Sequence, residues 1–362
     1  MAINFRRAGG SAQVPQNPMH SQYKIQEYEQ SGDYASALKI ARNTYEGLLR
    51  QGFSQEAAKT SKTVERLEEK LLTLGSLRLL FDENYQPRGK LRQLLELVGM
   101  EPLSQAESAI VQINHWAQKN LLRQGERWQE QASRFEELKT AIKPLLSELG
   151  FIEATLPHFK KYEGAIVHGS LLLEVRIRLY YLVEQWCQGV RFPYLYFLSG
   201  ERPLEGQHEN IATLMQEGKS LLKIRKEGGE PLRFPKTEGE MVRLIWEQSE
   251  IPEEMRKEVK VHFINAPMKK DLKDGKFLRP TTSDAVEAWV KAVPPIGRYL
   301  AITNAPYINR QGLIARTIAP KVYCFDTIGA EANEQEEVAI FLDELARFIF
   351  QIKQNYDNKL ST

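Results

Sequence analysis

Two hydrophobic patterns divide this chain. From residue 22 to about residue 156, apolar residues recur at the spacing of amphipathic helices. From residue 164 onward, short apolar runs alternate with amphipathic segments, which is typical of parallel strands connected by helices. The pattern predicts a disordered lead-in over residues 1–21, a helical domain over 22–160 and an α/β domain over 161–362.

The helical half is predicted to form an irregular bundle. Asp33 has the residue type and the position of a helix cap. No spacing of His, Cys, Asp or Glu in this half matches a metal-site template. Its role is therefore structural, or it docks a protein partner. The expected helices cover residues 34–51, 54–75, 89–98, 103–122 and 126–149.

The second half is predicted to contain five strands that end in polar residues. The carboxyl ends of parallel strands meet at one edge of a sheet, and ligands bind beyond that edge. The stretch 297–310 carries the clearest signal, because a buried strand stops there at Thr303-Asn304 and a helix follows. The expected strands cover residues 165–167, 194–198, 260–264, 298–302 and 321–325.

Polar side chains at these turns are the candidate site residues. Gly169 and Ser170 would offer backbone and hydroxyl contacts to an anion at a helix N-terminus, and Arg310 would be the charge partner of that anion. Glu201 and Glu238 are the candidate catalytic acid or base. The expected ligand-binding residues are His168, Gly169, Ser170, Gly200, Thr282, Ser283, Asp284, Thr303, Asn304, Tyr307 and Arg310.

Two neighbouring features leave alternatives open. A metal site from Glu201, Glu205, His208 and Glu209 is conceivable, but a solvated loop is favoured because no tight spacing supports ligation. The charged segment 268–279 is long enough to fold over a ligand, and it can equally be a passive insertion.

Composition narrows the class of protein. Apolar residues at 42% and charged residues at 27% of 362 residues are ordinary for a soluble protein, and the net charge of +2 argues against a nucleic-acid binder. Cys187 and Cys324 cannot form a disulfide framework; we expect them to be inert core residues in a reducing compartment. The chain has neither a membrane-spanning apolar segment nor a secretory signal, so we expect a cytoplasmic protein unless a secretion system that ignores N-terminal signals exports it.

Five short motifs follow one another between residues 164 and 330. They are His168-Gly169-Ser170, Ser199-Gly200-Glu201, Thr237-Glu238-Gly239-Glu240-Met241, Thr282-Ser283-Asp284-Ala285, and the segment from Thr303 to Arg310. In this order they resemble the YdcF/SanA/ElyC-like family, which is of unknown function. The resemblance implies a Rossmann-like, mostly parallel sheet with flanking helices. It also implies a nucleotide-like ligand, with S-adenosylmethionine suggested for one branch.

The chain departs from the family at three motifs. The family histidine is Tyr307 here, the family Glu-Asn pair is Asp284-Ala285, and the second glycine after the first strand is Ser170. The glycine fingerprint of NAD-dependent dehydrogenases is absent. Two functions remain open. In the first, the protein binds a nucleotide-like or phosphorylated small molecule at the carboxyl ends of the strands, either with or without acting on it as a hydrolase or transferase. In the second, it is a non-enzymatic interaction or scaffold protein with a degenerate site, and its helical domain docks a protein partner.

Overall fold

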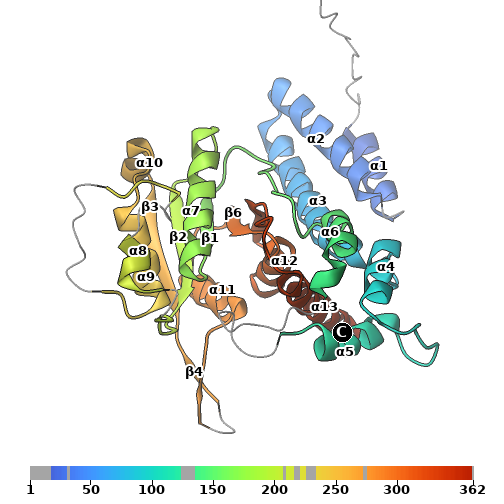
Figure 1. The fold of residues 1–362 in the computed structure, drawn as a ribbon. Helices are drawn as coiled ribbons and strands as arrows, with labels where there is room; N and C mark the ends of the chain where they lie inside the picture. The colour runs from blue at the N-terminus through green and yellow to red at the C-terminus, as the bar shows by residue number, and fades with distance from the viewer. Residues whose placement is uncertain are drawn as a thin grey trace, which may run out of the picture. The chain divides into compact units, whose positions relative to one another are not determined.

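The computed structural model describes residues 18–30, 33–123, 135–206, 209–215, 221–225, 234–271 and 275–360 (Figure 1). The chain divides into two compact units, Met1–Gly75 and Ser76–Thr362. The fold of each unit follows from the apolar faces of its own elements.

The larger unit is built on a parallel sheet. In the described part of the chain this sheet has five strands in the order β3-β2-β1-β6-β7, and every neighbouring pair is parallel. The order reverses between β1 and β6, which is where doubly wound sheets open a crevice for ligands. The predicted α/β, Rossmann-like sheet is confirmed. Its strands are β1 (Gly164–His168), β2 (Tyr194–Gly200), β3 (Lys260–Ala266), β6 (Gly297–Asn304) and β7 (Tyr323–Ala330).

Helices cover both faces of this sheet (Figure 1). Successive side chains of a strand point to opposite faces. Ala165 and Val167 of β1 accordingly share a core with α7 (Leu172–Cys187) and α9 (Glu238–Gln248). Ile166, between them, shares a different core with α11 and α12. These two helices span Thr282–Lys291 and Ile308–Ile318.

Three helices predicted for a separate helical domain belong to this larger unit. α4 (Gly89–Leu97), α5 (Ala109–Asn120) and α6 (Lys139–Glu148) share one apolar core with α13 (Val338–Leu360). The apolar face of the amphipathic helix α13 is buried against these three helices. The structure therefore divides the chain after Gly75 and not near residue 160. Buried members of this core include Leu94, Ile110, Ile142, Leu146, Phe341 and Leu345.

The smaller unit is helical. It contains α1 (Pro18–Gln30), α2 (Tyr34–Arg50) and most of α3 (Ser54–Leu80). Asp33 caps α2 as predicted, because its carboxylate accepts a hydrogen bond of 3.1 Å from the Ser36 amide. α1 begins inside the predicted lead-in, whose residues 1–17 lie outside the described residues. The buried core of these helices consists of Ile25, Ala37, Leu38, Ala41 and Leu67.

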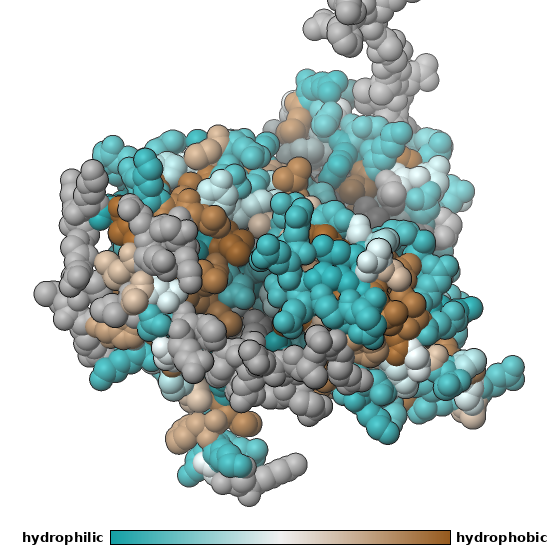
Figure 2. Space-filling model, in the orientation of Figure 1, coloured by the Kyte–Doolittle hydropathy of each residue, from teal (hydrophilic) through white to brown (hydrophobic). Residues whose placement is uncertain are grey.

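One prediction about the second half was wrong, and the charged segment forms strands that were not predicted. β7 continues to Ala330, so Asp326 lies inside the strand rather than after it; its buried carboxylate accepts a hydrogen bond of 2.5 Å from Tyr162. The charged segment 268–279 contains an antiparallel pair, β4 (Lys269–Lys270) and β5 (Phe277–Leu278), with residues 272–274 outside the described ranges. Both residues of β5 are exposed, and Figure 2 shows apolar surface on this projecting hairpin.

Short elements and one cysteine were also misjudged. α8 (Ile211–Met215) and α10 (Glu253–Glu258) were not predicted, because five or six residues do not establish a helical period. Cys187 is exposed at the end of α7, so it is not a core residue, and Cys324 is partly exposed. The predicted helix 126–149 is described only from residue 135, as a short 3₁₀ turn followed by α6. No described helix has the length and apolar content that a membrane span requires.

The shared core predicts that α6 and the sheet unfold together. Replacing the fully buried Ile142 by Ala should destabilise the larger unit by about 2–5 kcal/mol. The loss should appear as faster hydrogen exchange at β6 amides, and Ile142→Val should cost only about 1 kcal/mol. Unchanged exchange in β6 would mean that α4–α6 form an independent domain after all.

Candidate functional site

A cavity of about 450 Å³ lies at the carboxyl ends of β1 and β2. It is bounded by the turns that lead into α7, α9, α11 and α12, on both sides of the point where the strand order reverses. The structure thus brings together residues from all five sequence motifs. Of the candidate residues, those lining this cavity are His168, Gly169, Ser170, Gly200, Glu238, Thr282 and Arg310.

Arg178 fixes the end of β1 beneath the cavity. This buried α7 side chain donates from Nη1 to the carbonyls of His168 and Gly169, at 2.8 and 2.7 Å. Its Nε donates to Asn304 Oδ1 at 2.8 Å, and its guanidinium lies 5.9 Å from the centre of the Tyr307 ring. Asn304 and Tyr307 do not line the cavity; they support Arg178. Sequence reasoning missed Arg178, although an arginine among the apolar positions of a buried helix is a signal.

Arg202 is the centre of a second cluster of buried charged side chains, which also includes Glu209 and Glu238. Its two terminal nitrogens donate to Glu209, both at 2.7 Å, and one of them also reaches the Ser170 carbonyl at 3.0 Å. Its Nε pairs with Glu238 at 2.9 Å. Glu209 is 1% exposed, so the predicted solvated loop is wrong at this residue. The neighbouring Glu201 is exposed and outside the cavity lining.

Glu238 is the buried carboxyl group of the site. Burial raises its pKa to about 7, helped by the nearby Glu209 charge and opposed by Arg202 and Arg178. One of its oxygens lies against Gly169, where a Cβ atom would overlap it. The same Cβ would approach the Leu198 carbonyl to 2.8 Å. Glycine is therefore required at residue 169 by the close approach of Glu238 and β2.

Two buried neutral groups line the cavity without hydrogen-bond partners. His168 Nε2 and Gln311 Oε1 have none among the described residues, and both side chains are less than 5% exposed. Burial lowers the pKa of His168 to about 3, and the charges of Arg178 and Arg310 add to this effect. The imidazole is therefore neutral at physiological pH. Buried polar atoms normally have a partner, so a bound polar molecule is the expected one.

Positive charge surrounds these groups. Arg310 Nε pairs with the buried Glu344 at 2.5 Å. Asp343 accepts from both Arg123 and Arg347; although burial opposes it, these arginines hold the pKa of Asp343 below its usual value. Arg123, Arg310 and Arg347 are thereby held in fixed positions. The arginines that line the cavity are Arg123, Arg202, Arg279, Arg310 and Arg347.

The remaining candidate residues lie outside the lining. Asp284 forms a capping box with Thr281, which is the N-cap of α11, and pairs with Lys269. Thr303 is fully buried in β6, and Ser283 lies in the first turn of α11.

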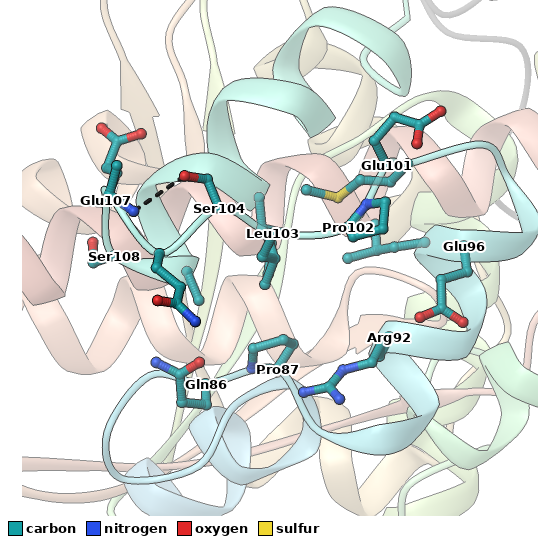
Figure 3. Close-up of a pocket in the computed structure, with 16 residues that line it drawn as sticks. Gln86, Pro87, Arg92, Glu96, Glu101, Pro102, Leu103, Ser104, Glu107 and Ser108 are labelled. Atoms are coloured by element: carbon teal, nitrogen blue, oxygen red, sulfur yellow. Dashed lines mark hydrogen bonds between the residues drawn. The ribbon is translucent and has the colours of Figure 1, made fainter.

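A larger cavity of about 780 Å³ lies between α4 and the loop before α5 (Figure 3). Its floor is apolar, with Leu95 and Ile113 buried, and Glu96, Glu101 and Glu107 are exposed at its rim. No strand end reaches it, and none of its lining side chains has a buried polar atom without a partner. The cavity at the sheet edge is therefore the better candidate site.

Metal ligands do not gather in the described part of the chain, where no group of three His, Cys, Asp or Glu side chains could hold an ion. His208, a member of the conceivable metal site, lies outside that part. Comparisons of the chain with protein-family models, with curated proteins and with solved structures gave no match. The assignment of the site rests on its geometry.

The close approach at residue 169 predicts a steric cost. Gly169→Ala should destabilise the protein by about 1–3 kcal/mol, because its Cβ would overlap Glu238 and crowd the Leu198 carbonyl. Gly89→Ala is the matched control, since no atom lies within 4 Å of its added Cβ. Urea unfolding of both variants measures the difference. A Gly169→Ala protein as stable as the Gly89→Ala protein would contradict this packing.

Proposed function

We propose that this protein binds a nucleotide-like or phosphorylated small molecule in the cavity at the carboxyl ends of its parallel strands. The observation that carries the proposal is the arginine lining of a cavity located where the strand order reverses. Guanidinium groups match the geometry of phosphate and carboxylate oxygens. Arg310, held by Glu344, is one such donor.

A helix N-terminus adds to the attraction for an anion. α7 begins after Leu171, a residue that lines the cavity and whose side chain offers no capping hydrogen bond. The first amides of a helix carry partial positive charge and need acceptors. A phosphate oxygen next to Ser170 would supply one, as in other helix N-terminal anion sites.

The neutral groups favour a ligand with an uncharged polar part. His168 and Gln311 have buried polar atoms that a sugar hydroxyl or the edge of a base could satisfy. A volume of about 450 Å³ is within the range of small-molecule sites. The arginine lining favours phosphorylated ligands over S-adenosylmethionine, whose sulfonium is cationic, although the family resemblance keeps that molecule among the candidates.

Glu238 is the candidate acid or base if the ligand is also a substrate. A pKa of about 7 suits proton transfer at neutral pH. The chemistry would then be hydrolysis or group transfer at the phosphorylated end. Glu201 is exposed and does not line the cavity, so this role is assigned to Glu238.

A thermal-shift screen tests the proposal. A mononucleotide or sugar phosphate present at about 100 times its Kd should raise the melting temperature by about 5 °C or more, because it binds only the folded state. S-adenosylmethionine and divalent metals belong in the same screen. The absence of a shift from every class would favour the alternative, a non-enzymatic interaction protein.

To test Arg310 in this screen, its buried partner Glu344 has to be replaced as well. Arg310→Gln alone would leave the Glu344 carboxylate buried without its partner, so the double variant Arg310→Gln, Glu344→Gln is used. Its ligand-induced shift should disappear, and Glu344→Gln alone should retain one. Full retention of the shift in the double variant would remove Arg310 from the binding site.

A further inference from the structure

Two carboxylates share the Arg202 guanidinium unequally. Glu209 takes both terminal nitrogens at 2.7 Å and also accepts from the Glu205 amide at 2.9 Å. Glu238 holds only the Nε, at 2.9 Å. Glu209 therefore takes most of the hydrogen-bonding capacity of the guanidinium, and the charge of Glu238 is less well compensated.

Glu238 is also the carboxylate that a ligand would meet. Among the described residues that line the cavity it is the only acidic one, whereas Glu209 lies behind Arg202. An anion drawn in by Arg279 and Arg310 would come close to this carboxyl group. Two like charges in a buried site disfavour each other, so both cannot remain ionised without cost.

We propose that the cavity binds its anion together with one proton, which Glu238 carries. This inference rests on the proposed function of the site. Ligand entry changes Glu238 from an acceptor into a hydrogen-bond donor, so the protonated carboxyl group can donate to an oxygen of the anion. The ligands selected are those with an oxyanion group, such as a phosphate or sulfate ester, because they present both the charge and an acceptor oxygen.

Glu238 is the residue whose protonation we expect to change when the anion binds. The charged groups packed against it are Arg202, Glu209 and Arg178. The cavity lining adds Arg123, Arg279, Arg310 and Arg347. Arginine does not release its proton in proteins. His168 is already neutral, since its pKa lies near 3, and the pKa of Glu238, about 7, lies in the physiological range.

Sulfate is the probe for the test, because it keeps the same charge throughout the pH range used. Sulfate titrations of the full chain by calorimetry should show affinity falling by about tenfold per pH unit above about pH 7, where free Glu238 loses its proton. Near pH 8, titrations in two buffers with different ionisation heats should report uptake of about one proton per sulfate, falling toward none below about pH 6.

Variants assign the proton to its residue. Glu238→Gln mimics the protonated form and should bind sulfate with the same affinity at every pH tested. Glu240→Gln, an exposed glutamate on the same helix, should keep the wild-type pH dependence. A pH dependence that persists in Glu238→Gln would overturn the assignment. If Glu238→Gln does not fold, proton uptake by the wild type decides.

The outcomes separate this inference from the function it rests on. Wild-type sulfate affinity that does not change with pH, without proton uptake, would overturn the inference and leave anion binding intact. No sulfate binding at any pH, in the wild type or in Glu238→Gln, would overturn both. Binding that weakens with pH only in proteins with an intact Glu238 supports both.

Discussion

The hydrogen bonds of Arg178 are the interaction on which the site depends. Where β1 ends, the carbonyls of His168 and Gly169 turn away from the sheet ladder and still need donors, because buried backbone groups rarely remain unpaired. Arg178 supplies these donors from α7 and reaches Asn304 at the end of β6. One guanidinium thus joins the two strands between which the sheet reverses its order. Its charge also lowers the pKa of His168 and keeps that imidazole neutral.

Buried carboxylates that do not line the cavity compensate the positive charge of arginines that do. Glu209, Asp343 and Glu344 each hold at least one of the arginines that line it. A paired carboxylate offsets part of the desolvation cost of a buried guanidinium, and it also holds the guanidinium in one orientation; Arg123, Arg202, Arg310 and Arg347 are paired in this way. Fixed donors lose less conformational freedom when a ligand binds than mobile surface side chains do. The same carboxylates reduce the net positive charge, so the choice of ligand depends on geometry as well as on charge.

The sheet was predictable because its signals are local. Each strand of a buried parallel sheet is a short apolar run, and the polar residues after it identify its carboxyl end. The domain boundary was not predictable in this way, because no local sequence signal identifies it. Helices α4–α6 have amphipathic patterns that fit a separate bundle as well as they fit the face of α13, which lies far along the chain. Periodicity shows that a face is apolar, but it does not show which element covers it.

The site was predictable where residues follow strands, and unpredictable where a partner is distant in sequence. Asn304 was expected to orient a ligand, yet it accepts a hydrogen bond from an arginine on α7 that no motif includes. Gly169 was expected to expose its backbone to an anion. The structure adds a steric reason, since the carboxyl group of Glu238 occupies the space that a side chain at residue 169 would fill. Two motifs that are separate in the sequence are therefore one packed unit, in which the missing Cβ atom of Gly169 lets a buried carboxyl group reach the cavity.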